Sequence, residues 1–192
     1  MNFSKIDKIQ ILTDKFFYKK ENDYEIYYKD DYINFDIFNN HILDEKKISS
    51  FLNKLNNPFS IIFKNDKRII VSSDHNRTYP LFIFFKSQNE LVIGDNPRKI
   101  LEKIKSDFKF NKDSIIEAYF SGYVLGNNTL INNLFQISAG QYFHWENLTK
   151  KTYTNTYYKY SYKPVKKFNL EDKLNLLDSK INQSIIRTIK KA

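Results

Sequence analysis

The stretch 72–85, SSDHNRTYPLFIFF, places an acid, an imidazole and a guanidinium close together at Asp74, His75 and Arg77. Such a trio could act as the acid, the base and the electrostatic clamp of a catalytic loop. The alternative is a turn, in which Asp74 accepts hydrogen bonds from backbone N–H groups of its own loop while His75 and Arg77 face solvent. We favour the turn, because the sequence offers no nucleophile to complete a catalytic set.

Thiols and histidines, the usual nucleophiles and metal ligands, are scarce. None of the 192 residues is a cysteine, which excludes disulfides, thiolate metal sites and a cysteine nucleophile. The three histidines, His41, His75 and His144, lack the spacing of a zinc site. His41 is placed in a turn, and His144 is interpreted as a surface or half-buried strand residue rather than a catalytic one. We therefore expect no metal site.

Apolar runs between residues 59 and 95 predict buried strands. FSIIFK and RIIVSS flank a short polar turn, and PLFIFF and ELVIGD repeat the arrangement, so we expect a meander of four antiparallel strands. Nearly continuous apolar runs indicate burial on both faces, which requires a layer over each side of the sheet. Alternation over 23–38 predicts two further strands that turn at 29–31.

Apolar residues at helical spacing predict helices whose first residues have capping side chains. The expected helices cover 44–55, 96–107, 111–123 and 169–192. Asp44, Asn96 and Asn169 are the expected N-caps, and Gly122 closes the third helix. The last helix is amphipathic, and its apolar stripe continues to the end of the sequence. We infer that the sequence was cut from a longer chain.

The charge distribution argues against nucleic acid as a partner. The formal net charge is +9, but residues 1–160 contain 23 basic and 19 acidic residues, against eight and three in 161–192. Only four basic residues are arginines, the side chain that phosphate and base recognition favours. The N-terminus has no apolar run suited to a signal peptide or membrane anchor, so a cytoplasmic protein without membrane contacts is expected.

Several loose motifs in a fixed order give the chain its family likeness. The strand pair and turn of 59–85 are followed by LVIGDNPRKIL and then by Gly-Tyr, Thr-Leu and Ala-Gly pairs at 122, 129 and 139. In this order and spacing, residues 59–192 resemble the type 2 glutamine amidotransferase domain at the N-terminus of the asparagine synthetase family. The matched positions are interpreted as structural marks of that family, and they are Asp74, Pro80, Leu81, Gly122, Thr129 and Gly140.

The resemblance implies both a fold and a chemistry. The fold would be α+β, a four-layer αββα sandwich of antiparallel sheets like that of the N-terminal-nucleophile (Ntn) hydrolases, with a C-terminal amphipathic helix. The chemistry would be attack on glutamine by a cysteine directly after the initiator Met, which releases ammonia. Here the chain begins Met1-Asn2-Phe3, and the family's Asn-Gly oxyanion segment has no counterpart. We expect no catalytic residues and no hydrolysis of glutamine.

Arg77 departs from the family pattern, because it occupies a glycine position. Glycine readily adopts backbone conformations that other residues avoid. The loop is therefore expected to follow a different backbone path from that of the family.

The resemblance also implies a domain order: an amidotransferase-like domain at 1–160, a linker at 161–168, and the first helix of a truncated synthetase domain at 169–192. No cofactor is expected in this chain, because ATP and magnesium would bind in the missing synthetase domain. That domain is the expected partner, and a homodimer is a further possibility. The alternative function is a stand-alone, non-enzymatic binding module that docks a partner through a basic C-terminal helix. A third possibility is a synthase fragment whose nucleophile lay upstream of Met1.

Overall fold

The computed structural model describes residues 8–21, 23–29, 45–55, 57–87, 90–105, 108–149, 151–162 and 169–189. Contacts divide the chain into two units, Met1–Lys159 and Tyr160–Ala192, and each is described by itself. Several expectations lie outside the described residues, namely those for Met1-Asn2-Phe3, the strand up to 38, His41, the Asp44 cap and most of the linker.

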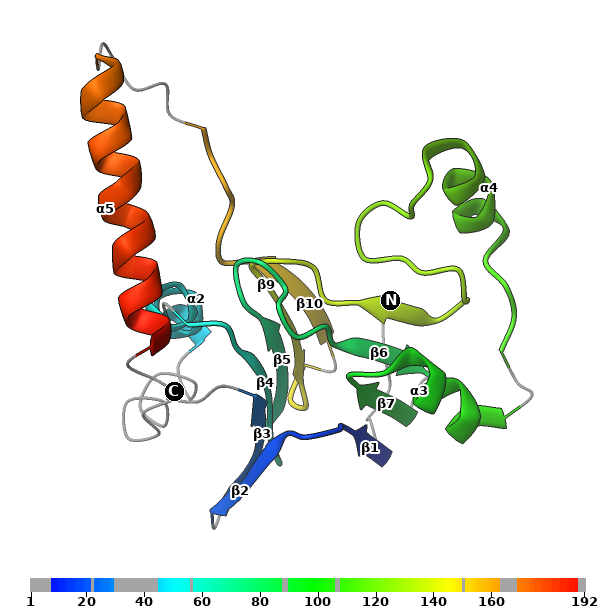
Figure 1. Ribbon diagram of the computed structural model, residues 1–192. Helices are drawn as coiled ribbons and strands as arrows, with labels where there is room; N and C mark the ends of the chain where they lie inside the picture. The colour runs from blue at the N-terminus through cyan, green and yellow to red at the C-terminus, as the bar shows by residue number, and fades with distance from the viewer. Residues whose placement is uncertain are drawn as a thin grey trace. The chain divides into compact units, whose positions relative to one another are not determined.

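A six-stranded antiparallel sheet forms one half of the first unit (Figure 1). Its order is β10-β9-β5-β4-β3-β2. The strands are β2 (Phe17–Glu21), β3 (Tyr24–Lys29), β4 (Ser60–Asn65), β5 (Arg68–Ser73), β9 (Gln141–Glu146) and β10 (Lys151–Thr156). The β4–β5 turn closes because the Asn65 side chain accepts hydrogen bonds from the N–H groups of Lys67 and Arg68, at 3.0 and 2.8 Å.

A four-stranded sheet forms the other half, with the order β1-β7-β6-β8. Its strands are β1 (Lys8–Leu12), β6 (Phe82–Phe85), β7 (Glu90–Gly94) and β8 (Leu134–Gln136). β1 pairs with β7 in parallel, whereas β6 pairs with both neighbours antiparallel. The edge strands β8 and β10 thus belong to different sheets.

Three hydrophobic clusters place the core between and outside the sheets. The inner cluster joins Ile62 and Val71 of the larger sheet to Ile83 and Ile93 of the smaller one. Helix α2 (Glu45–Lys54) packs on the outer face of the larger sheet, and α3 (Pro97–Ile104) packs on the outer face of the smaller one. The layers are therefore helix, sheet, sheet, helix, as the expected αββα sandwich requires.

The expected meander over 59–95 is wrong in its topology. β4 and β5 pair in the larger sheet, whereas β6 and β7 pair in the smaller one. Burial on both faces is confirmed, since each hairpin has the other sheet on one side and a helix layer on the other. Periodicity reports whether each face is covered, not which strand lies next to it.

The caps of two helices are those that the sequence predicts. The Asn96 side chain accepts from the Arg98 N–H at the start of α3. Helix α4 (Lys112–Ser121) ends at the predicted Gly122, in the left-handed conformation with φ +81°. Its N-cap is Asn111, which accepts from the Ser114 N–H and which the sequence analysis did not predict. The helices start and stop where the sequence places them, to within a few residues.

The second unit consists of α5 (Leu170–Ile189) and the segment before it. The Asn169 side chain accepts from the Asp172 N–H at 2.8 Å, which is half of a capping box. The apolar stripe of α5 is exposed, from Leu174 at 56% to Ile181 at 48%. No helix among the described residues is long and apolar enough to cross a membrane.

Candidate functional site

The two sheets are joined by the segment 74–80, here called the Asp74 loop, which runs from the end of β5 to the start of β6. Asp74 is buried, with 4% of its surface exposed. Its backbone N–H donates to the Phe59 carbonyl at 3.1 Å, and its own carbonyl accepts from Arg77 at 3.2 Å and from Gly140 at 2.9 Å. The loop is therefore fixed by backbone contacts before any side chain is considered.

The Asp74 carboxylate binds backbone donors on both sides of the loop. It accepts from the N–H groups of Asn76 at 2.7 Å and Thr78 at 3.2 Å, which confirms the predicted turn. It also accepts from the buried N–H of Phe59 at 3.0 Å, just before β4. The sequence did not predict this third contact. Because these donors occupy the carboxylate, Asp74 acts as a structural anchor and not as a catalytic acid.

His75 and Arg77 do not simply face solvent, so that part of the prediction is wrong. The His75 ring stacks on Tyr158 with centroids 3.9 Å apart and planes at 16°. Arg77 lies over the Phe82 ring at 5.6 Å, and burial lowers the pKa of its guanidinium. Both side chains are half-buried, because His75 packs on Tyr158, which follows β10, and Arg77 packs on Phe82 at the start of β6.

Arg77 has φ +55°, in the left-handed region that favours glycine. The resemblance places a glycine at this position. The backbone at Arg77 thus has a conformation that glycine adopts readily, and an arginine in this conformation is less stable than a glycine would be.

Gly140 lies against the Asp74 loop although it is distant in sequence. Its carbonyl accepts from the N–H groups of Tyr157 and Tyr158 at 2.9 and 3.1 Å. Its φ is +65°, and a Cβ built there would lie 2.4 Å from the Tyr158 carbonyl oxygen. Glycine is needed both for the conformation and for the close approach. The tertiary structure thus brings together Asp74 and Gly140, two of the predicted positions.

Leu81 and Pro80 mark the far end of the loop. Leu81 is fully buried in the inner cluster, and its carbonyl accepts from the Ile137 N–H at 2.9 Å. Pro80 is exposed beside it. Leu81 thus ties the loop to the segment between β8 and β9, while Pro80 faces out.

Thr129 and Gly122 do not join this group. The Thr129 hydroxyl donates to the carbonyls of Leu134 and Ile131, at 2.8 and 3.2 Å, and accepts from the Ile131 N–H at 3.1 Å. It therefore shapes a separate loop before β8. Gly122 caps α4 and is exposed.

His144 is fully buried in β9, which corrects the expectation of a surface or half-buried residue. β9 is paired on both sides, with β5 and β10, so on its face of the sheet the His144 side chain is flanked by residues of two neighbouring strands, Ile70 and Tyr153. The His144 ring lies 6.1 Å from that of Tyr153. Among the described residues no group of three or more His, Asp or Glu could hold a metal ion.

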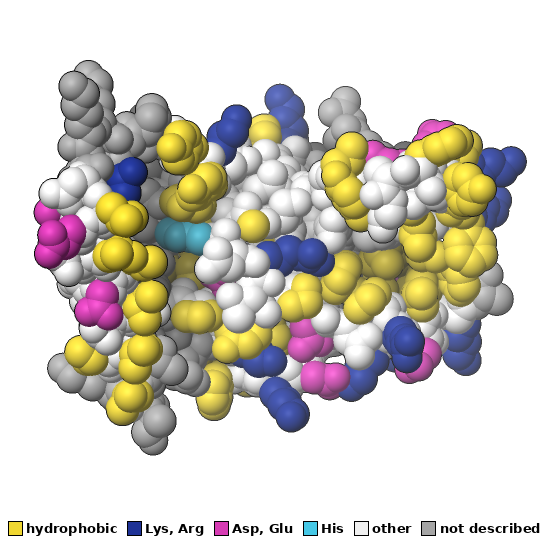
Figure 2. Space-filling model, turned by 45° about the horizontal axis from the view of Figure 1, so that its top comes forward, with side chains coloured by type: hydrophobic (Ala, Val, Ile, Leu, Met, Phe, Trp, Pro, Cys, Tyr) yellow, Lys and Arg dark blue, Asp and Glu magenta, His cyan; other side chains and the backbone are white. Residues whose placement is uncertain are grey.

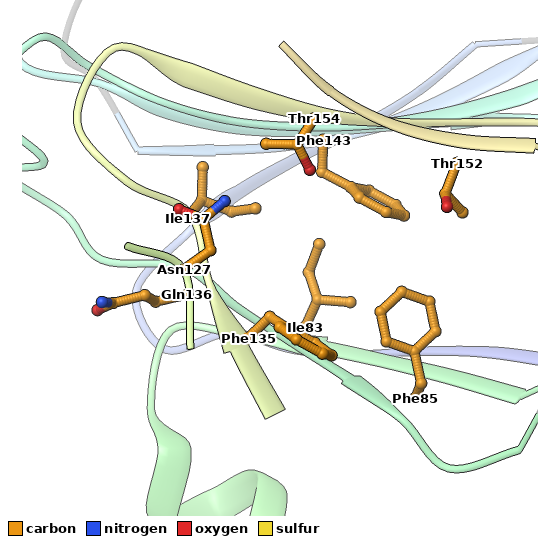
Figure 3. A pocket seen from close by; sticks show the side chains of 9 residues that line it. All are labelled: Ile83, Phe85, Asn127, Phe135, Gln136, Ile137, Phe143, Thr152 and Thr154. Atoms are coloured by element: carbon orange, nitrogen blue, oxygen red, sulfur yellow. The ribbon is translucent and has the colours of Figure 1, made fainter. Parts of the chain in front are cut away.

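A cavity of about 210 Å³ lies between the sheets near the edge strands β8 and β10. Figure 3 shows Ile83, Phe85 and Phe143 pointing toward one another across it. Asn127, Thr152 and Thr154 add polar atoms. None of the nine lining residues is ionisable. The cavity can bind a small neutral molecule, but its lining offers no general acid or base.

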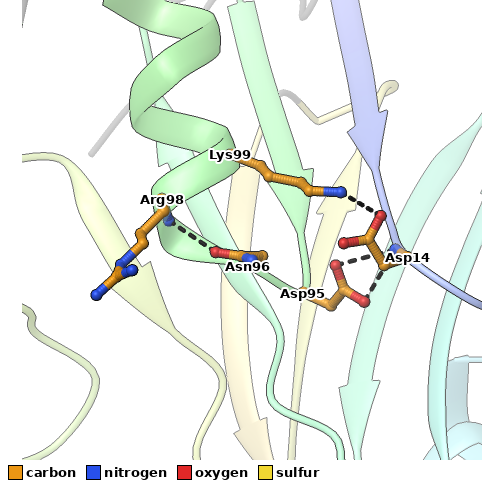
Figure 4. Close-up of polar contacts among 5 residues, drawn as sticks. All are labelled: Asp14, Asp95, Asn96, Arg98 and Lys99. Atoms are coloured by element: carbon orange, nitrogen blue, oxygen red, sulfur yellow. Dashed lines mark hydrogen bonds and ion pairs between the residues drawn. The ribbon is translucent and has the colours of Figure 1, made fainter.

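A second polar cluster, which the sequence did not reveal, lies beside α3 (Figure 4). The Asp14 N–H donates to both carboxylate oxygens of Asp95, at 3.1 and 3.0 Å, and Lys99 pairs with the Asp14 carboxylate. Burial is the main cause that raises the pKa of Asp95, and the Asp14 N–H opposes it. These bonds hold the end of β1 against the start of α3. The only sequence signal was an acid between a strand and a capped helix.

Comparison with known proteins gives distant structural likeness alone. No family model matches the chain. No curated protein matches it either. Among solved structures, it is similar to a glutamine phosphoribosylpyrophosphate amidotransferase from B. subtilis, solved in complex with ADP and GMP, with 9% identity and a TM-score of 0.43. The match covers 74% of this chain and 31% of that protein's chain, so this chain spans about a third of its length.

Proposed function

We propose that this chain is a cysteine-free, amidotransferase-like domain at the N-terminus of an asparagine-synthetase-type amidoligase. Its role is architectural: it covers one side of a synthetase active site that binds ATP and magnesium. The nitrogen donor is free ammonia or another amine, because the 192 residues contain no thiol to attack glutamine.

The observation that carries this proposal is the contact between the Asp74 loop and Gly140. The resemblance rests on motifs whose order was read from the sequence, and two of them meet through the Asp74–Gly140 backbone hydrogen bond. The loop between them passes from one sheet of an αββα sandwich to the other. Residues that serve this junction have a structural role that does not require the nucleophile.

The absence of an alternative catalytic group supports the inactive part of the proposal. The Asp74 carboxylate is occupied by three backbone donors, and the His75 ring is stacked on Tyr158. The cavity between the sheets is lined by residues that cannot transfer protons at neutral pH. Within the described part of the chain, no arrangement replaces the missing cysteine.

A glutaminase assay tests the proposal directly. The purified chain is incubated with glutamine, and glutamate is measured against a heat-treated sample of the same preparation. We expect equal signals. Release of glutamate above the control, abolished when the chain is omitted, would overturn the inactive-glutaminase claim.

The coding sequence after Ala192 tests the ligase part. A strand, a Ser-Gly-Gly-x-Asp-Ser loop and a helix would supply the phosphate site that an ATP-dependent synthetase needs. We expect this motif in frame. A stop codon directly after Ala192 would instead favour the stand-alone binding module.

The binding-module alternative relied on a basic terminal helix, and α5 itself is not basic. Its acidic residues are Glu171, Asp172 and Asp178, and its basic residues are Lys173, Lys180 and Arg187, so three charges of each sign cancel. The basic surplus of 161–192 lies on either side of the helix. Attraction to an anionic partner is therefore not a property of α5.

A further inference from the structure

The cavity between the sheets exists because the inward residues of β10 are small. The register of β10 with β9 places Thr152 beside Trp145 and Thr154 beside Phe143. Trp145 and Phe143 belong to the inner cluster, so both threonines lie on the inward face of β10. Most positions of the inner cluster hold isoleucine, leucine or an aromatic residue, which fill more space than threonine. Thr154 therefore remains exposed although it faces the other sheet.

The cavity has an apolar floor and opens toward a polar rim. Ile83, Ile137 and Phe143 form the floor and are 1%, 2% and 5% exposed. Phe85 and Phe135 are half-buried and form the walls. β8 and β10 are edge strands, and no described strand pairs with their outer sides. A small molecule can therefore enter between these two edges.

Free hydrogen-bonding groups gather at one end of the cavity. Figure 3 shows Asn127 and Thr154 at this end and Phe85 at the other. The side-chain carbonyl oxygen of Asn127 accepts a hydrogen bond from the Ser138 hydroxyl, which fixes the amide. The Asn127 NH₂ group and the Thr154 hydroxyl have no hydrogen-bond partner among the described residues. This end thus offers a ligand one donor and one group that can donate or accept.

The walls and the volume suit a single aromatic ring. The Phe85 ring meets that of Phe135 edge to face, with centroids 5.7 Å apart, and that of Phe143 in the same way at 6.0 Å. Aromatic rings attract one another in this arrangement at centroid distances of about 4.5–7 Å. The volume of about 210 Å³ exceeds the roughly 150 Å³ of an apolar cavity that binds benzene. A benzene ring with one or two small substituents therefore fits.

The lining requires a neutral ligand. Charged side chains of both signs are scattered among the hydrophobic ones on the face that Figure 2 shows, but none of the nine residues that line the cavity is charged. A charged group held there would lose its hydration without gaining a counter-ion. This excludes nucleotides, carboxylates and zwitterionic amino acids such as glutamine. A phenol is neutral at pH 7, because its pKa is near 10, and its hydroxyl both donates and accepts.

We propose that the cavity is a binding site for a neutral monocyclic phenol. The ring of the ligand lies against Phe85, Phe135 and Phe143, and its hydroxyl bonds to the Asn127 NH₂ group and the Thr154 hydroxyl. The proposal goes beyond the amidoligase assignment and does not depend on it, since it uses only residues that line the cavity.

An NMR titration of the full nitrogen-15-labelled chain with p-cresol tests the proposal. Trp145 is the only tryptophan, and it lies beside Thr152 of the lining, so its single indole N–H signal reports on the cavity. We expect this signal and the backbone signals of β8 and β10 to shift saturably, with a dissociation constant of about 1 mM or lower. Benzoate has a similar size but a charge, and it should give no saturable shift. Failure of p-cresol to saturate, or equal binding of benzoate, overturns the proposal.

Two variants place a ring on opposite faces of β10. Thr154→Phe puts it where the ligand would lie, so p-cresol should bind about 10-fold more weakly or worse. Lys151→Phe puts it on the outward face and should leave binding unchanged. Both positions are exposed, so circular dichroism should show the wild-type fold. Binding that survives Thr154→Phe, or that Lys151→Phe weakens equally, overturns the proposal.

Thr154→Val tests the polar end, because it removes the hydroxyl and keeps the shape of the side chain. Toluene has the ring and methyl group of p-cresol but no hydroxyl, so it serves as the reference ligand. The affinity for p-cresol relative to toluene should fall by about 3- to 10-fold in Thr154→Val. An unchanged ratio would overturn the assignment of the hydroxyl to this end of the cavity.

Discussion

Asp74→Ala tests whether one buried carboxylate fixes the junction between the two sheets. The side chain accepts from the N–H groups of Phe59, Asn76 and Thr78. The Phe59 N–H is buried, so leaving it without an acceptor costs about 1–3 kcal/mol. Asn76 and Thr78 are exposed, and water can replace the carboxylate there, so each lost bond costs about 0.5–1 kcal/mol. The expected loss is therefore about 3 kcal/mol, a large fraction of a typical domain's stability.

Urea unfolding followed by circular dichroism measures this loss through the shift in midpoint at constant m-value. The free energy of unfolding of Asp74→Asn should lie between those of the wild type and Asp74→Ala. The amide keeps one acceptor oxygen, but its NH₂ group faces a backbone donor that it cannot accept from. Asp66→Ala, in the exposed β4–β5 turn, is the control and should change stability by less than about 0.5 kcal/mol. A loss below about 1 kcal/mol for Asp74→Ala would refute the anchor role.

Three further predictions concern backbone strain and ionisation. Gly140→Ala should lower the free energy of unfolding by about 2 kcal/mol or more, since its Cβ would clash with the Tyr158 carbonyl oxygen. Gly126→Ala has the same φ of +65° but open space around the Cβ, so it should lower the free energy of unfolding by only about 1 kcal/mol. Equal losses for the two variants in urea unfolding would contradict this. Arg77→Gly should be more stable than Arg77→Ala by about 1 kcal/mol, because only glycine relieves the left-handed backbone, and the same unfolding experiment decides it. Burial, with the charge of Glu25 second, raises the pKa of Tyr27 to about 12, so the contribution of its neutral phenol to stability is complete below pH 10 and is lost as the pH rises toward 12. Burial also raises the pKa of Tyr157, so ultraviolet titration should show more than one late phenol, and Tyr27→Phe should remove the one that titrates near pH 12.

The predicted helix caps show what local chemistry determines. Asn96 and Asn169 cap their helices through their own side chains, and Gly122 ends α4 in the left-handed conformation. Each of these effects acts over a few residues, so the sequence around the position is sufficient to predict it. The nearly continuous apolar runs of 59–95 likewise predicted strands covered on both faces.

The candidate site was predictable only in part. Asp74 was recognised as a turn residue from its neighbours, because two of its three donors lie in its own loop. The third donor, Phe59, and the contact with Gly140 come from other parts of the chain. His75 was misjudged for the same reason, since its stacking partner Tyr158 follows β10. A local pattern carries no information about such distant partners.

The sequence by itself determined the buried strands of 59–95, the helices, several helix caps and the absence of a thiol nucleophile, because each depends on residue type and short-range spacing. The tertiary structure alone decided that the strands of 59–95 divide between two sheets and that the Asp74 loop is anchored to Gly140. Those outcomes depend on which distant segments pack together. The packing free energy depends on contacts between segments throughout the unit, so it cannot be predicted from any short stretch of the sequence.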